Sequence, residues 1–208
     1  VNFEKYIDHA INYPILFLKK NEKYYSPNGQ TFRDFLNGNL SFLKGAKPTL
    51  EDFENHLGTI FTEVRLKQVI ELRSLDTCNF GCICNGPAFF TGLIYGSLEE
   101  TYEIIKNWKK EEVMEAYFNA PKKGLNTLLN NKKLIDWGRI FLDLSKKGLE
   151  KRNEMNKSGK NETIYLKHIE EIIENKKTRA EMLIEQFNKV KNLDFLVNHD
   201  ENFSYSGF

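Results

Sequence analysis

The amino-acid sequence predicts an α+β fold, and two patterns support that prediction. Short apolar runs separated by turn residues gather in the first third of the chain, up to Ser74. Beyond Asn85, apolar residues recur at the three- and four-residue spacing of amphipathic helices. Strands followed by helices are typical of the α+β class, so we expect part of an antiparallel sheet and then a helical C-terminal region.

The first elements are short and are bounded by proline and turn residues. Residues 2–12 have apolar side chains at helical spacing, and Pro14 interrupts that helix. Residues 15–18 form a continuous apolar run, which predicts a buried strand. The polar residues 20–23 predict a hairpin turn, with residues 24–25 on the return strand.

Two helices begin after threonines that fit the N-cap position. Thr31 precedes a helix over residues 32–37, and Gly38 ends it because glycine readily adopts the left-handed conformation. Thr49 precedes the second helix, with Asp52 three residues later. Both starts are therefore predicted from local sequence alone.

The helix after Thr49 has one apolar face, formed by Leu50, Phe53 and Leu57. His56 falls on the opposite, polar side of that helix. We therefore expect His56 to have a capping or surface role, with a role in a functional site as the alternative.

The segment Thr62–Ser74 contains the charged residues of most interest. At a period of two, one face is apolar except for a glutamine: Val64, Leu66, Gln68, Ile70 and Leu72. The opposite face is mostly charged: Glu63, Arg65, Lys67, Val69, Glu71 and Arg73. This pattern predicts one half-buried strand with a charged face, on which Gln68 would mark a bulge or a break.

Glu71 and Arg73 lie two residues apart on that face, which is roughly 6.5–7 Å along a strand. They could therefore reach one phosphate-sized object from the same side. A carboxylate is a hard oxygen ligand suited to Mg²⁺, and a guanidinium can hold phosphoryl or carboxylate oxygens with two parallel bonds. The alternative is a strand whose charged face is simply exposed to water.

The remainder of the chain is expected to be mainly helical. Amphipathic spacing occurs in five segments, residues 98–108, 111–118, 133–149, 162–174 and 178–190. Residues 87–95 are apolar almost throughout, which predicts a buried segment, and residues 151–161 read as a polar loop. We expect a single lobe, with a strand-containing part at 1–84, a helical part at 85–197 and a tail at 198–208.

Composition excludes several classes of protein. The 208 residues carry a formal net charge of +1, which gives no support for nucleic-acid binding. No apolar run approaches the roughly 20 residues that span a bilayer, so no membrane segment is expected. The three cysteines, Cys78, Cys82 and Cys84, lack zinc-site spacing, which indicates plain packing or free thiols in a reducing, cytoplasmic compartment.

The charged segment resembles a signature of glutamate–cysteine ligases of the plant and proteobacterial type. Residues 63–67 read E-V-R-L-K, and after three residues 71–73 read E-L-R, similar to E-V-R-L-K-x-x-x-E-x-R in that family. Relatives usually have proline where this chain has Thr62. Further blocks resemble the family in order: residues 6–14, 29–35, 48–57, 84–95 and 148–152. The chain begins with Val1, and we expect it to be the carboxy-terminal half of such a ligase.

The resemblance implies a glutamine synthetase-like catalytic fold and an ATP- and Mg²⁺-dependent ligation of L-glutamate to L-cysteine. By motif position, Glu71 resembles a Mg²⁺ ligand and Arg73 the arginine that contacts the transferred phosphoryl group. Arg65 and Lys67 become candidates for binding substrate. Tyr95 is a candidate for lining the amino-acid pocket, with a core aromatic as the alternative.

Two other functions stay open at this point. One is a related carboxylate–amine ligase with another amine acceptor, because acceptor choice depends on pocket shape. The other is a non-catalytic helical interaction module, or an inactive truncation. The residues do not indicate an oligomeric state.

Overall fold

The computed structural model describes residues 2–76 and 82–194. They fall into two compact units, Val1–Asp76 and Thr77–Phe208, and each is considered by itself. The expectation that residues 1–208 form a single lobe stays a prediction. The expected tail at 198–208 lies outside the described residues.

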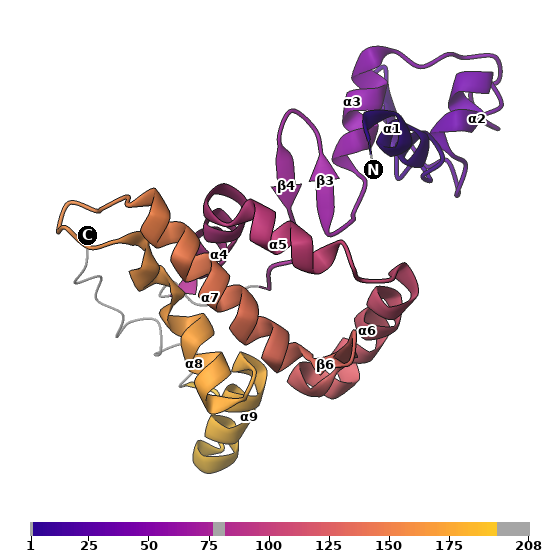
Figure 1. Ribbon diagram of the computed structural model, residues 1–208. Helices are drawn as coiled ribbons and strands as arrows, with labels where there is room; N and C mark the ends of the chain where they lie inside the picture. The colour runs from indigo at the N-terminus through magenta and orange to yellow at the C-terminus, as the bar shows by residue number, and fades with distance from the viewer. Residues whose placement is uncertain (1, 77–81, 195–208) are drawn as a thin grey trace. The chain divides into compact units, whose positions relative to one another are not determined.

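The first unit combines three short helices with two antiparallel hairpins (Figure 1). The helices are α1 (Phe3–Ile11), α2 (Phe32–Asn37) and α3 (Leu50–Gly58), and the hairpins are β1 (Leu18–Lys20) with β2 (Lys23–Tyr25) and β3 (Val64–Leu66) with β4 (Ile70–Leu72). Its core is a cluster of buried apolar side chains, namely Ile15, Leu18, Phe32, Phe35 and Leu40. Helices with small antiparallel sheets confirm the α+β class at this coarse level.

Local capping signals account for the helix starts. The Thr31 side chain accepts the Asp34 backbone N–H, while the Asp34 carboxylate accepts the Thr31 backbone N–H. Thr49 and Asp52 form the same reciprocal cap on α3. Gly38 ends α2 in the left-handed conformation with φ 77°. The predicted boundaries of α2 and its end at Gly38 are thus confirmed.

The predicted strand at residues 15–18 is wrong, because the strand begins only at Leu18. Ile15 and Leu18 are buried in the core, whereas Leu16 and Phe17 are exposed. The apolar run therefore turns two of its side chains outward before the strand starts. The hairpin turn is confirmed, with its two central residues, Asn21 and Glu22, at positive φ.

The segment Thr62–Ser74 is a hairpin rather than one strand. β3 and β4 pair antiparallel with Arg65 opposite Glu71, and the Lys67 N–H donates to the Val69 carbonyl across the turn. The break falls at Gln68, the residue that disturbed the apolar face. The burial is also reversed from the expectation, since Ile70 is exposed and Arg65 is buried.

His56 is also placed differently from the sequence expectation. Its side chain is only 2% exposed and stacks on Phe32, with ring centroids 4.9 Å apart. Its Nε2 lies 2.8 Å from the Ala10 carbonyl oxygen, so a neutral ring can donate Nε2–H and join α3 to α1. The predicted capping or surface role is therefore wrong: His56 belongs to the interior of the first unit.

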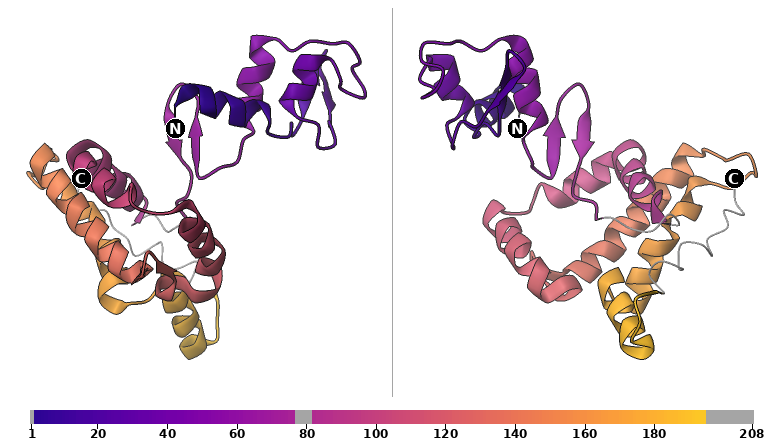
Figure 2. Two further views of the ribbon diagram at one scale, coloured as in Figure 1. Left: turned by 45° about the vertical axis from the view of Figure 1, so that its right-hand side comes forward. Right: turned by 180° about the vertical axis from the view of Figure 1, so that it is seen from behind.

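The second unit is mainly helical, as predicted, and the described part is arranged around one long helix, α7 (Figure 2). Its elements in order are α4 (Asn85–Thr91), the π-helical turn η2 (Gly92–Gly96), α5 (Leu98–Ile105), α6 (Lys110–Lys123), η3 (Gly124–Asn126), β5 (Leu128–Leu129), β6 (Lys132–Lys133), α7 (Leu134–Arg152), η4 (Glu162–Leu166), α8 (Lys167–Asn175) and α9 (Arg179–Val190). Contacts from α4, η2, η4 and α8 converge on α7 and enclose buried Leu142, Leu149 and Leu166.

The crossing of η2 and α7 is unusually close because both helices present small residues. A Cβ added to Gly96 would lie 2.3 Å from the Gly148 Cα, and one added to Gly148 would lie 2.0 Å from the Gly92 carbonyl oxygen. Next to this crossing, the Ser145 hydroxyl on α7 donates to the Phe89 carbonyl on α4. Glycine is required here by contact between the two backbones.

Residues 87–95 are only partly buried, so the prediction of a buried segment holds for part of this range. Gly92 and Leu93 face the interior, whereas Tyr95 is 75% exposed. The close packing of the small residues occupies one side of the turn, which directs the large side chain of Tyr95 to the opposite side. Among the described helices, none is both long enough and apolar enough to cross a membrane.

Candidate active site

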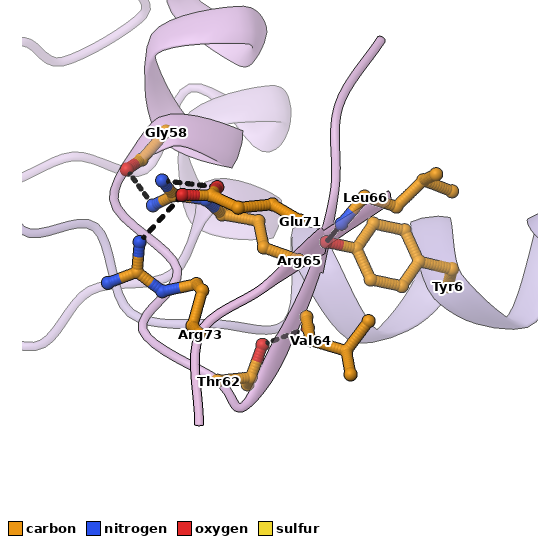
Figure 3. A network of polar contacts seen from close by, with 8 residues as sticks. All are labelled: Tyr6, Gly58, Thr62, Val64, Arg65, Leu66, Glu71 and Arg73. Atoms are coloured by element: carbon orange, nitrogen blue, oxygen red, sulfur yellow. Dashed lines mark hydrogen bonds and ion pairs between the residues drawn. The ribbon is translucent and has the colours of Figure 1, made fainter. Parts of the chain in front are cut away.

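Three charged residues of the β3–β4 hairpin segment, Arg65, Glu71 and Arg73, form one network (Figure 3). Arg65 and Glu71 are cross-strand partners, so their side chains leave the same face of the hairpin. The Arg65 Nε and Nη2 atoms each lie 2.7 Å from Glu71 Oε2. One carboxylate oxygen therefore receives both N–H groups on one edge of the guanidinium.

Arg65 is held from a second side by the end of α3. Its Nη1 donates to the Gly58 carbonyl, one of the carbonyls that a helix end leaves without an intrahelical partner. The side chain is only 10% exposed. All three guanidinium nitrogens thus have hydrogen-bond partners within the protein, and these bonds offset the cost of burying a charged residue.

Arg73 follows β4 and approaches the other oxygen of Glu71. Its Nη1 lies 3.2 Å from Glu71 Oε1, and the centre of its guanidinium lies 5.3 Å from the Phe61 ring centroid. Its backbone N–H donates to the Glu63 carbonyl at 2.7 Å. In Figure 3 the remainder of the guanidinium points away from Glu71. Among the described residues, no further hydrogen bond or ion pair involves it.

The hydrogen bond from Arg65 is the main reason that the pKa of Glu71 lies below its usual value. Partial burial opposes this effect, and the positive charges of Arg65 and Arg73 reinforce it. Glu71 is therefore ionised at neutral pH. Two guanidinium groups and one carboxylate leave one excess positive charge, so the network favours an anion beside the accessible edge of Arg73.

Within the described network, Glu71 is the side chain that could bind a metal ion at this hairpin. An ionised carboxylate has about four lone-pair directions, and the arginines occupy three of them here. The Glu71 side chain is 38% exposed, which leaves Oε1 room for one further partner. Across residues 2–76 and 82–194, no group of three or more His, Cys, Asp or Glu side chains gathers as a metal site.

The other two predicted site residues lie outside this network. Lys67 is exposed on the turn of the same hairpin, and none of the described acidic residues forms an ion pair with it. Tyr95 belongs to the second unit, where the Arg152 guanidinium lies 5.8 Å from its ring centroid. Its exposure rules out the alternative of a core aromatic.

Sequence reasoning missed three residues that hold the hairpin in place. The Tyr6 hydroxyl on α1 accepts the Leu66 backbone N–H at 2.9 Å, Gly58 accepts from Arg65, and Phe61 lies beneath Arg73. Tyr6 stands in a block that resembles the ligases, but its contact partner is 60 positions away. No periodicity or spacing could have revealed that pairing.

The cysteines differ from one another. Cys84 is a free thiol and is partly buried, whereas Cys82 is disulfide-bonded. The expectation of packing or a free thiol is therefore wrong for Cys82. Cys78 lies outside the described residues.

Comparison with known proteins identifies relatives along nearly the whole chain. The family model described as glutamate–cysteine ligase family 2 matches residues 1–199. The chain is 38% identical over 187 residues to the chloroplastic glutamate–cysteine ligase of Solanum lycopersicum, covering 89% of this chain and 35% of that protein. It is 37% identical over 188 residues to the chloroplastic enzyme of Arabidopsis thaliana, with the same two coverages. The chain thus spans about a third of the length of these curated relatives.

The comparison corrects the expected compartment. The relatives from Solanum lycopersicum, Nicotiana tabacum and Oryza sativa are all named as chloroplastic proteins. These names contradict the expectation of a cytoplasmic protein, which rested on the number of cysteines.

Proposed function

We propose that this chain, which belongs to glutamate–cysteine ligase family 2, contributes to the ATP-dependent joining of L-glutamate to L-cysteine. ATP would phosphorylate the γ-carboxylate of glutamate and leave as ADP. The cysteine amine would then attack the acyl carbon of γ-glutamyl phosphate, and phosphate would leave as γ-glutamylcysteine forms. This ligation begins glutathione biosynthesis, and the names of the relatives support it.

The observation that supports this function best is the position of Arg73. One of its N–H groups is bound to Glu71, and the rest of its guanidinium is directed away from that carboxylate. We assign Arg73 to the oxygens of the phosphoryl group in transfer, where a planar fork of N–H donors matches the geometry of the group. Little covalent chemistry is left to the protein, so a preorganised positive charge is what it can contribute.

Glu71 has two functions in this proposal. It orients both arginines, and its remaining Oε1 lone pair is suited to one coordination position of Mg²⁺. A bound Mg²⁺ would neutralise negative charge on the phosphates. A single carboxylate leaves most of the coordination sphere to water, phosphate oxygens and other ligands.

The other candidate site residues are assigned by their exposure and contacts. Arg65 was expected to bind substrate, but its three engaged nitrogens support a role in positioning Glu71. Lys67 is exposed with a flexible cation, which suits a substrate carboxylate. Exposed Tyr95 remains a candidate for lining the amino-acid pocket.

We also propose that the hairpins belong to a larger glutamine synthetase-like sheet, since a two-stranded ribbon is marginally stable by itself.

The test is replacement of Arg73 by lysine in the full-length enzyme, with ADP release and γ-glutamylcysteine both measured. We expect turnover to fall by at least about tenfold, because lysine offers a point charge in place of a planar fork. The matched control is Arg33→Lys, since Arg33 pairs with Asp8 away from the hairpin. A variant that only raises the KM for cysteine would contradict the assignment of Arg73 to the phosphoryl group.

Amine specificity needs a separate measurement. The same assay with cysteine replaced by other small amines measures acceptor choice directly. A clear preference for another amine would place the protein with a sister carboxylate–amine ligase, while leaving the role of Arg73 intact.

A further inference from the structure

Phe61 is an exposed aromatic residue directly before the hairpin. Its side chain is 60% exposed, yet the Arg73 guanidinium lies over its ring with 5.3 Å between the guanidinium carbon and the ring centroid. The placement of a cation over an aromatic face at this distance is a cation–π contact, which stabilises the position of the guanidinium.

The backbone around Phe61 fixes this arrangement. The Thr62 hydroxyl donates to the Val64 carbonyl at 2.6 Å, which closes the turn into β3. The Arg73 backbone N–H donates to the Glu63 carbonyl at 2.7 Å, which ties the end of β4 to the residues just after Phe61. One side-chain bond, from Thr62, and one main-chain bond, from Arg73, thus fix the backbone that carries the ring and the guanidinium.

We propose that Phe61 is a positioning residue for Arg73, an inference that rests on the proposed function of the hairpin. Glu71 Oε1 holds one end of the guanidinium, and the Phe61 ring supports the group through its face. With both contacts in place, the long side chain has few conformations left to lose when an anion binds. The accessible N–H groups are then directed at the position where phosphoryl oxygens would lie.

Replacement of Phe61 should change turnover more than substrate binding. Loss of the ring leaves the charge of Arg73 and its bond to Glu71 in place and removes only the support under the guanidinium. The loss should therefore appear in kcat, because the geometry of the phosphoryl group changes most in the transition state. The KM values should stay near their original level.

The experiment compares Phe61→Leu and Phe61→Trp in the full-length enzyme. For Phe61→Leu we expect kcat to fall roughly two- to tenfold, the range of one cation–π contact, with each KM changed less than about twofold. Phe61→Trp should keep at least half of the original kcat, because indole is the better partner for a cation. The matched control is Phe118→Leu, which removes a ring that is 65% exposed on α6.

A double-mutant cycle tests whether the ring acts through the arginine. Phe61→Leu should have a smaller effect in the Arg73→Lys background, because an ammonium lacks the planar face of a guanidinium. Equal losses in both backgrounds would overturn the inference. So would a Phe61→Leu variant that raises only the KM for ATP, since the ring would then bind nucleotide directly.

The cycle also separates this inference from the proposed function. If Arg73→Lys retains full turnover, the proposed role of the hairpin fails. If Arg73→Lys loses turnover while Phe61→Leu does not, only the role of Phe61 fails. Should Phe61→Leu not fold, as judged by its circular dichroism melting curve, Phe61→Tyr and Phe61→Trp replace it. A tenfold loss of kcat in both of these would also overturn the inference, because both retain an aromatic face.

Discussion

The buried ring of His56 predicts a specific loss of stability in mild acid. Burial is the main cause that lowers the pKa of this histidine below its ordinary value of 6.5, and the bond to the Ala10 carbonyl opposes the shift only in part. The buried Nδ1 has no hydrogen-bond partner, so a proton added there would be an unpaired buried charge. As the pH falls below 6.5, the unfolded chain therefore takes up the proton before the folded chain does.

The size of this effect follows from linkage. The unfolded state binds the additional proton, so stability is complete above pH 6.5 and declines as the pH falls toward the lowered folded-state value. One proton limits the loss to about 1.4 kcal/mol for each pH unit in that window. The lowered pKa values of Asp34, Asp52, Glu71 and Glu181 act at lower pH, below their ordinary values of 3.8 to 4.5.

The assay is urea unfolding of the chain at pH 7.5, 6.5 and 5.5, compared with His56→Gln. Glutamine keeps an N–H donor for the Ala10 carbonyl but does not titrate. The matched control is His9→Gln, which alters an exposed histidine on α1. If the original chain and His56→Gln lose the same stability between pH 7.5 and 5.5, the buried ring is not the source of the acid sensitivity and the reasoning fails.

Three further predictions concern other contacts. Tyr6→Phe removes the acceptor for the Leu66 N–H and should cost about 1 kcal/mol in urea unfolding, whereas Tyr24→Phe, at an exposed ring, should change nothing measurable. Gly148→Ala should lower the free energy of unfolding by about 1–3 kcal/mol, because the new methyl group would force two backbones apart. The control is Gly138→Ala on the same helix, where a methyl group makes only ordinary contacts, and equal melting curves for the two variants would contradict the close crossing. Glu71→Gln should lower turnover at saturating Mg²⁺ by about a hundredfold or more. The control is Glu170→Gln, which also removes a carboxylate from an ion pair, and a loss within about threefold for Glu71→Gln would exclude the metal role.

Sequence patterns predicted the features that depend on near neighbours. The reciprocal caps at Thr31 and Thr49 involve residues three positions apart, so residue types alone specify them. The left-handed end at Gly38 is equally local. The α+β class also followed, because it depends on the order of patterns along the chain.

The features that sequence missed depend on contacts made when the chain turns back on itself. A period of two is the same in one strand and in two strands joined by a turn, so the pattern over residues 62–74 predicts a single strand where the structure has a hairpin. The burial of Arg65 requires both Glu71 and the Gly58 carbonyl, and a charged residue without known partners is expected to be exposed. His56 is buried by contacts with Ala10 and Phe32.

The short length of the hairpin has a consequence for its motions. Each strand has only three residues, and such a ribbon holds together mainly through its attachments, the Tyr6 hydroxyl on one edge and the Gly58 carbonyl at the base. Fraying of these attachments would separate Arg65, Glu71 and Arg73 in a single local opening event. Anion affinity would then exist only in the closed population, and hydrogen exchange at the Leu66 amide would report how large that population is.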